Sequence, residues 1–144
     1  MPHIDRDGTR VYYEERGKGP AVLLTHGYGA TLRMWDKQMA ALADGYRLIT
    51  WDMRGHGLTD SPDDPAAYSH EATVADMEAV LRECGVDRAV IGGLSLGGFM
   101  SLAFHLAHPD QVRALMLFDT GPGYRKNGSR ERWNRYADQT ARAF

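Results

Sequence analysis

The fold is decided by residues 88–109, which read RAVIGGLSLGGFMSLAFHLAHP. The apolar residues 89–91 predict a short buried strand, and residues 99–107 predict a helix that Pro109 ends. Between them, residues 93–97 match the pattern G-x-S-x-G, in which a serine occupies a sharp turn from strand to helix. Because neighbouring side chains would collide at such a turn, the positions two before and two after the serine must be small.

Ser95, at the centre of this pattern, is the candidate nucleophile. The turn is expected to lift its hydroxyl out of the sheet. The N–H groups that open the following helix favour nearby negative charge, such as the oxyanion that forms when an ester carbonyl is attacked. The alternative is a glycine-rich turn with an incidental serine. The strand before the motif and the helix after it favour the nucleophile.

Strands and helices alternate along the rest of the chain. We expect a hairpin of residues 3–6 and 10–16, further strands at 21–25, 47–51 and 112–119, and helices from about residue 32, from residue 70 and through 131–136. Ser69 and Ser129 are the expected caps of the last two helices. This order predicts an α/β fold: a mostly parallel sheet with helices on both faces and an N-terminal hairpin. Sites in such sheets lie beyond the carboxyl ends of the strands.

The composition is that of a globular domain. Of the 144 residues, 43% are hydrophobic and 25% are charged, and the net charge of −2 argues against nucleic acid or an anionic membrane surface as a partner. The single cysteine, Cys84, excludes an internal disulfide and suits a reducing cytoplasm. No apolar signal-peptide core opens the chain, and no run approaches the ~20 apolar residues of a membrane span. We therefore expect a cytoplasmic protein.

The chain resembles the N-terminal half of an α/β-hydrolase fold protein. The resemblance is carried by three segments in family order, His26-Gly27-Tyr28-Gly29, residues 52–57 (DMRGHG) and residues 93–98 (GLSLGG). It is closest to the group of esterases, enol-lactonases and cofactor-free haloperoxidases. Epoxide hydrolases and haloalkane dehalogenases of this family carry aspartate as nucleophile, so Ser95 favours acyl transfer. The resemblance assigns residues 1–120 to the hydrolase core and 121–144 to the helical start of a cap region.

The resemblance also implies roles for single residues. The backbone N–H groups of Tyr28 and Leu96 would form the oxyanion hole. Asp119, at the end of a predicted strand, is the candidate acid, with a loop-fixing carboxylate as the alternative. His26 is expected to shape the oxyanion loop or to line the pocket, and it is also a possible stand-in base.

The positions of the histidines bear on two questions: which of them could act as a base, and whether the chain binds a metal. His105 and His108 fall on the helix after Ser95, roughly three turns from it, where their side chains point away from the nucleophile. They also lack a third ligand within sequence reach, so we expect no metal. We expect no cofactor either. The six arginines and lysines between residues 125 and 142 are expected to form a solvated helix face.

Two functions remain open at this point. The first is a serine hydrolase for carboxylic esters or lactones, which is weak because the acid-and-histidine tail of the family is missing from these residues. The second is a catalytically incomplete half-fold that self-assembles as a structural unit. A third, weaker idea is an incomplete copy of a longer hydrolase whose remaining part is supplied by a separate chain. Residues 112–119 would then be an exposed sheet edge, which predicts a homo-oligomer formed through this edge or by exchange of the terminal helix.

Overall fold

A computed structural model describes residues 2–142 and shows a six-stranded sheet with the order β1-β2-β4-β3-β5-β6. The strands are β1 (His3–Arg6), β2 (Thr9–Arg16), β3 (Ala21–Thr25), β4 (Arg47–Trp51), β5 (Ala89–Leu94) and β6 (Val112–Phe118). Strands β4, β3, β5 and β6 run parallel, whereas β2 is antiparallel to β4 and to β1. The predicted hairpin and the mostly parallel sheet are confirmed.

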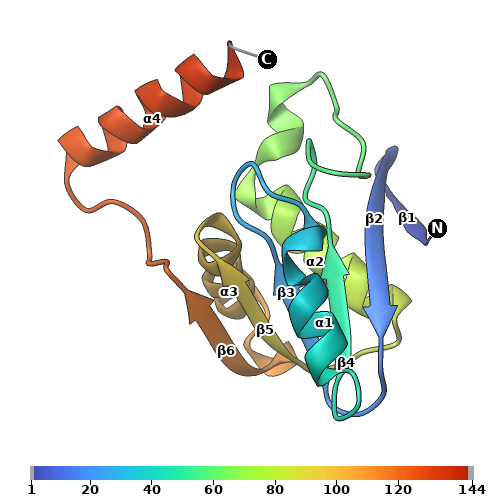
Figure 1. The fold of residues 1–144 in the computed structure, drawn as a ribbon. Coiled ribbons are helices and arrows are strands. Elements are labelled where there is room, and N and C mark those ends of the chain that lie inside the picture. Colours follow the sequence, from blue (N-terminus) through green and yellow to red (C-terminus); the bar gives the residue numbers. More distant parts are fainter. Residues whose placement is uncertain (1, 143–144) are drawn as a thin grey trace.

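Helices cover both faces of this sheet (Figure 1). They are α1 (Asp36–Leu42), α2 (His70–Glu83), α3 (Leu96–Ala107) and α4 (Asn127–Ala141), with 3-10 turns at Leu32–Trp35, Pro65–Tyr68 and Pro109–Gln111. Helix α1 lies on one face, and α2 and α3 lie together on the other. Helix α4 lies away from the sheet, beyond the carboxyl end of β6.

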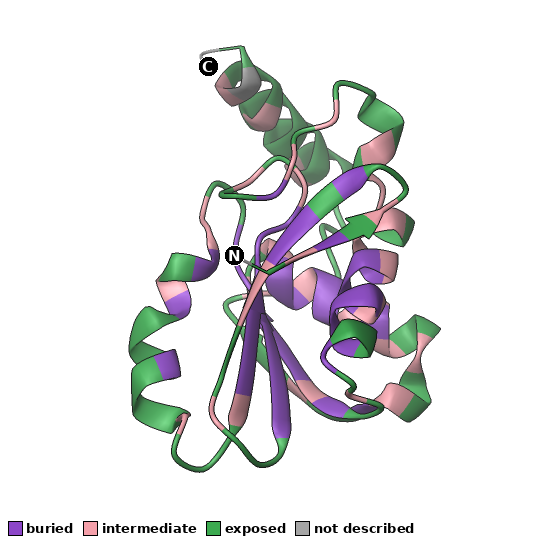
Figure 2. Ribbon diagram, turned by 90° about the vertical axis from the view of Figure 1, so that its right-hand side faces the viewer, coloured by how far each residue is buried: buried purple, intermediate pink, exposed green. Residues whose placement is uncertain are grey.

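Side chains of the central strands alternate between two apolar cores, because successive residues of a strand point to opposite faces. Leu23, Ile49 and Ile91 belong to the larger core, which α2 and α3 complete. Val22, Leu24, Leu48, Trp35 and Met39 make up the smaller core beneath α1. All five residues of β3 are buried, so the continuous apolar run 21–25 reflects a strand covered on both faces (Figure 2).

Two helix starts differ from the sequence-based expectation. The helix expected from residue 32 opens as a 3-10 turn, whose cap is the Thr31 hydroxyl, and becomes α-helical only at Asp36. The expected cap at Ser129 is wrong, because α4 begins at Asn127 and Ser129 lies inside its first turn. By contrast, the Ser69 hydroxyl accepts a hydrogen bond from the Ala72 amide at 3.1 Å, which confirms the cap of α2.

Strand β6 lies at one edge of the sheet and pairs only with β5 within residues 2–142. Its carboxyl-terminal half is apolar and exposed: Met116, Leu117 and Phe118 expose 36%, 43% and 37% of their surface. This confirms the expected exposed edge. No helix in the described part of the chain has the length and apolar character needed to cross a membrane.

Candidate active site

Ser95 is the single residue between the end of β5 and the start of α3. Its backbone has φ 51° and ψ −112°, a left-handed conformation that L-residues with side chains rarely adopt. Such strain persists only where the surrounding structure holds it in place, and it clusters at functional sites. Ser95 is exposed although the residues that flank it at 92–93 and 97–98 are buried. The serine is therefore presented at the surface by a buried corner.

Close backbone packing explains the glycines of this corner. A Cβ atom on Gly97 would lie 2.2 Å from the carbonyl oxygen of Thr25 and 2.5 Å from that of His26. A Cβ on Gly93 would lie 2.3 Å from the Gly97 carbonyl carbon. These distances leave no room for a side chain, because each neighbouring atom belongs to the backbone. The start of α3 is thus seated directly on the end of β3.

Two backbone N–H groups near Ser95 have no acceptor among the described residues. The N–H of Leu96, the first residue of α3, has no partner inside its helix. The N–H of Tyr28 donates no hydrogen bond to any described residue. Gly27, which precedes Tyr28, packs against the nucleophile, since a Cβ built on it would lie 3.7 Å from the Cβ of Ser95. Both donors are therefore available beside the serine.

The loop that carries Tyr28 is anchored by side chains from the loop after β4. The amide of Gly29 donates to Nε2 of His56 at 3.2 Å, and the amide of Leu32 donates to Oδ1 of Asp52 at 2.7 Å. The other oxygen of Asp52 accepts from the Leu58 amide at 2.9 Å. Asp52 is only 2% exposed. These anchors fix the backbone that follows Tyr28.

His26 is buried behind the same loop, and both of its ring nitrogens are engaged. Nε2 accepts a hydrogen bond from the Met53 amide at 3.0 Å, and Nδ1 lies 2.8 Å from the carbonyl oxygen of Gly27, to which it donates as the neutral tautomer. Burial lowers the pKa of His26 and so favours this neutral form. The arrangement suits a residue that shapes the oxyanion loop. Neither ring nitrogen of His26 is therefore free to accept a proton from Ser95 as a stand-in base.

The end of β6 and the residues just after it hold the backbone of Ser95. The Ser95 amide donates to the Phe118 carbonyl oxygen at 2.9 Å, and the Thr120 hydroxyl donates to the Ser95 carbonyl oxygen at 2.6 Å. Asp119, between these two residues, has a φ of 43°. It lines the same pocket as Ser95, a cavity of about 390 Å³. The pocket is lined by Ser95, Leu96, Phe99, Asp119, Thr120, Gly121, Gly123, Tyr124 and Trp133.

None of the described histidines lines this pocket. His108 packs its ring against Phe104, with centroids 5.0 Å apart, and Nδ1 of His105 is buried without a hydrogen-bond partner among the described residues. The ring of His70 lies 5.9 Å from that of Phe99, which itself lines the pocket. The described residues also contain no group of three potential metal ligands.

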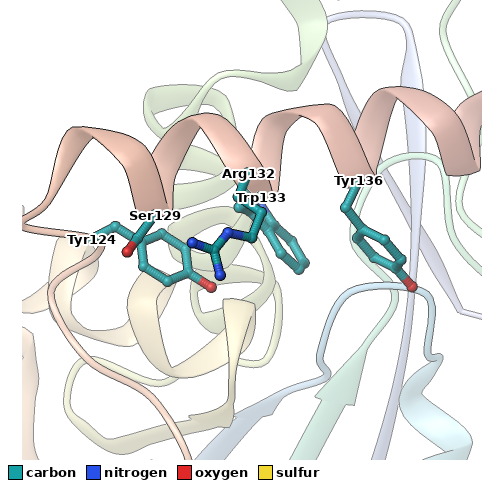
Figure 3. Close-up of a pocket in the computed structure, with 5 residues that line it drawn as sticks. All are labelled: Tyr124, Ser129, Arg132, Trp133 and Tyr136. Carbon is teal, nitrogen blue, oxygen red and sulfur yellow. The ribbon is translucent and has the colours of Figure 1, made fainter.

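Sequence reasoning missed the aromatic wall of the site. Trp133 of α4 lies edge-on to Tyr28, with ring centroids 5.7 Å apart, and Tyr124 and Phe99 complete the lining. A second pocket, of about 480 Å³, lies under α4 and shares Trp133 with the first (Figure 3). It is lined by Tyr124, Ser129, Arg132, Trp133 and Tyr136. The only sequence signal was a cluster of aromatic residues inside an otherwise polar segment.

Comparisons with known proteins agree with this geometry. "Epoxide hydrolase 2" from Siraitia grosvenorii is 36% identical over 114 residues, and "Fluoroacetate dehalogenase" from a Burkholderia species is 36% identical over 111 residues. Among solved structures, Est816, described as an N-acyl homoserine lactone degrading enzyme, superposes with a TM-score of 0.80 at 33% identity, covering 83% of this chain and 46% of its own. The enol-lactonase from Burkholderia xenovorans LB400 has a TM-score of 0.77 at 31% identity, with the same coverage.

The matches cover most of the length of this chain but only part of the length of its relatives. The two curated relatives are matched over 78% and 75% of this chain, and in both cases the match spans 36% of the relative's own length. The family model of the alpha/beta hydrolase fold matches residues 20–144. That range contains the nucleophile corner, both loops that surround it and α4. The chain belongs to the α/β-hydrolase fold family.

Proposed function

We propose that this chain carries the nucleophile and the oxyanion hole of a serine hydrolase that acts on carboxylic esters or lactones. One observation carries the proposal: an exposed serine in a strained left-handed conformation, beside two backbone N–H groups without acceptors. Donors that are already in place where negative charge develops lower the barrier of acyl transfer, and the loss of one such donor typically costs ~10²–10³ in turnover.

In the proposed reaction, the Ser95 hydroxyl oxygen attacks the acyl carbon and its proton passes to a base. The carbonyl electron pair moves onto oxygen, where the N–H groups of Tyr28 and Leu96 stabilise it. When the carbonyl reforms, the bond to the leaving alkoxide breaks and the alkoxide takes up a proton. Water then cleaves the acyl–serine bond, which releases the carboxylic acid and restores Ser95.

The base is not supplied by the residues that line the pocket, since none of them is a histidine. Asp119 is positioned in the pocket as the candidate acid that would orient such a base. Without a base, the oxyanion hole and substrate binding alone can sustain a residual acceleration of ~10³–10⁴ over water. We therefore expect slow turnover of activated esters by residues 1–144 alone.

Acyl transfer is favoured over epoxide opening because of the nucleophile. The curated relatives are named as epoxide hydrolases and a dehalogenase, whereas two solved structures are named as lactone-cleaving enzymes. Enzymes of the first two classes carry aspartate as nucleophile in this family, and this chain has serine at that position. A serine hydroxyl forms an acyl ester that water readily cleaves, which suits esters and lactones as substrates.

The test is covalent labelling with a fluorophosphonate probe, read by intact-protein mass spectrometry. We expect one adduct on the wild-type chain, none on Ser95→Ala, and an unchanged adduct on Ser61→Ala, whose serine is exposed and lies outside the pocket. Slow release of nitrophenol from a nitrophenyl ester should follow the same pattern. Labelling of Ser95→Ala at the wild-type rate would contradict the proposal.

A second proposal, self-association through β6, rests on the exposed edge of the sheet. An apolar edge strand with free N–H and C=O groups can pair with the same strand of a second copy across a two-fold axis. We expect a concentration-dependent dimer in size-exclusion chromatography with light scattering. Leu117→Lys should weaken it, whereas Leu106→Lys, at an 84% exposed position on α3, should not. A monomer at all micromolar concentrations would contradict this proposal.

A further inference from the structure

The pocket of Ser95 and the pocket under α4 are neighbours. Tyr124 and Trp133 line both cavities, so the two spaces adjoin at these aromatic side chains. The second cavity, of about 480 Å³, is large enough to hold part of a small-molecule substrate. A molecule that presents its carbonyl to Ser95 can therefore extend past Trp133 into the second pocket.

The second pocket combines flat apolar walls with one positive charge. Figure 3 shows Arg132 on the same side of α4 as Trp133 and Tyr136, with its guanidinium group between the rings of Tyr124 and Trp133 in this view. Rings of this kind offer stacking surface to a planar group. Arginine presents a fork of donors that matches a carboxylate. The pocket therefore has the chemistry for a planar or apolar group that carries a carboxylate.

Arg132 is not paired with any carboxylate in the part of the chain that the structure describes. Within residues 2–142 it takes part in no ion pair, although other arginines do, such as Arg54 with Asp76 and Arg47 with Glu15. The arginines of residues 125–142 were expected to form a solvated face, and Arg132 is indeed exposed, but it also lines a pocket together with three aromatic side chains. A guanidinium placed among aromatic rings without a counter-ion is free to bind an anion from solution.

The charges that line the two pockets also favour one orientation of a bound substrate. The acidic residue of the Ser95 pocket is Asp119, and no acidic residue lines the pocket under α4. A substrate carboxylate would be repelled at the Asp119 end and attracted at the Arg132 end. The anionic group is therefore favoured at the end of the substrate remote from the carbonyl that Ser95 attacks.

We propose that the pocket under α4 is a subsite for a carboxylate-bearing substrate. In this subsite, Arg132 binds the carboxylate, and the rings of Trp133 and Tyr136 pack against the planar or apolar group to which the carboxylate is attached. The orientation of this substrate toward Ser95 rests on the proposed acyl-transfer function. The subsite itself does not, because an anion can bind there whether or not Ser95 reacts.

The experiment measures binding rather than turnover, in Ser95→Ala protein. Phenylacetate and its neutral analogue phenylacetamide are titrated while tryptophan fluorescence is recorded. Trp133 is 37% exposed, whereas Trp35 and Trp51 are 5% and 0% exposed, so a ligand-dependent change should report Trp133 and vanish in Trp133→Phe. We expect phenylacetate to bind about tenfold more tightly than phenylacetamide, and added salt to reduce this preference.

The matched variants are Arg132→Gln and Arg135→Gln, which remove one charge each from the same helix, but only Arg132 lines the pocket. Arg132→Gln should bind both ligands equally, and Arg135→Gln should keep the preference, with far-UV circular dichroism showing that α4 is retained in both. Equal binding of the two ligands to the parent protein, or a preference that survives in Arg132→Gln, would overturn the subsite. Preference for phenylacetate together with failed fluorophosphonate labelling would support the subsite and contradict only the acyl-transfer function.

Discussion

The amide nitrogen of Ser95 lies 2.9 Å from the carbonyl oxygen of Phe118, the last residue of β6. Two residues later, the Thr120 hydroxyl donates to the carbonyl oxygen of Ser95 at 2.6 Å. The end of β6 and the residues that follow it thus bind both polar groups of the Ser95 backbone. Since Ser95 has a strained φ of 51°, these two hydrogen bonds help to maintain a conformation that the residue would otherwise leave.

Replacing Thr120 with valine should therefore affect both stability and reactivity. Thr120→Val removes the hydroxyl, and we expect the free energy of unfolding to fall by about 1 kcal/mol, as for a typical hydrogen bond, in urea denaturation. Fluorophosphonate labelling of Ser95 should slow, because the corner is less firmly held. Thr120→Ser retains the hydroxyl and is the control. If valine and serine variants label at the same rate, the hydrogen bond does not position the nucleophile.

A methyl group at Gly97 should be strongly destabilising. Gly97→Ala would place Cβ 2.2 Å from the Thr25 carbonyl oxygen, so β3 and α3 must separate. We expect a loss of about 3 kcal/mol in the free energy of unfolding, typical of severe overpacking. Gly128→Ala in α4, with nothing within 4 Å of the new Cβ, should be neutral or stabilise by up to ~1 kcal/mol through helix propensity. Equal stability of the two variants would contradict the close packing.

The buried ion pair between Arg54 and Asp76 should matter far more than an exposed one. Asp76 is 0% exposed and accepts from Arg54 Nε at 2.7 Å and from Nη2 at 2.9 Å. Asp76→Asn would leave the guanidinium without its counter-charge, and we expect a loss of about 3 kcal/mol in urea denaturation.

The matched exposed pair is Arg10 with Asp60, whose side chains are 67% and 34% accessible. Asp60→Asn should cost clearly less, since solvent screens the pair. A comparable loss in both variants would show that burial does not set the strength of these interactions.

Stability should fall as the pH drops through the range in which histidine titrates, and His26 should contribute to this. Burial lowers the pKa of folded His26 below its ordinary value of about 6.5. Above pH ~6.5 the ring is neutral in both the folded and unfolded states, so its contribution is complete; below that pH the unfolded state takes up the proton more readily, and the contribution is lost as the pH approaches the lowered pKa.

The measurement is urea denaturation at several values between about pH 7.5 and about pH 5.5, for the wild type and for His26→Gln. Glutamine can donate and accept but does not titrate here, so the variant should be less sensitive to pH over this range. The remaining histidines are common to both proteins, and the difference between the two curves isolates His26. Parallel curves would contradict the prediction.

The sequence predicted those parts of the fold in which burial imposes a pattern on consecutive residues. The apolar runs 21–25 and 47–51 predicted buried strands because a strand between two helical layers needs apolar residues on both faces. The sharp turn around Ser95 was predictable because close packing at Gly93 and Gly97 leaves no room for a side chain. In both cases the constraint acts on consecutive residues, which a single sequence displays directly.

Other features depended on contacts between distant parts of the chain. The start of α4 was placed at the wrong residue because Lys126, Asn127 and Ser129 lie in a polar segment without apolar periodicity. The side of α4 that faces the site, with Trp133 and Arg132, follows from how the segment after β6 is directed, and no local pattern encodes that. Tyr28 and Leu96 as oxyanion donors, and Asp119 as the acid, stay predictions that the labelling experiments address.

The corner that presents Ser95 is built from β3, β5 and β6, and α4 supplies none of the hydrogen bonds or backbone contacts that hold it. Under the proposed function, the residues that react and the residues that contact the substrate therefore belong to separate stretches of the sequence. Substitutions within residues 124–136 would then change which molecules bind without disturbing the Ser95 corner.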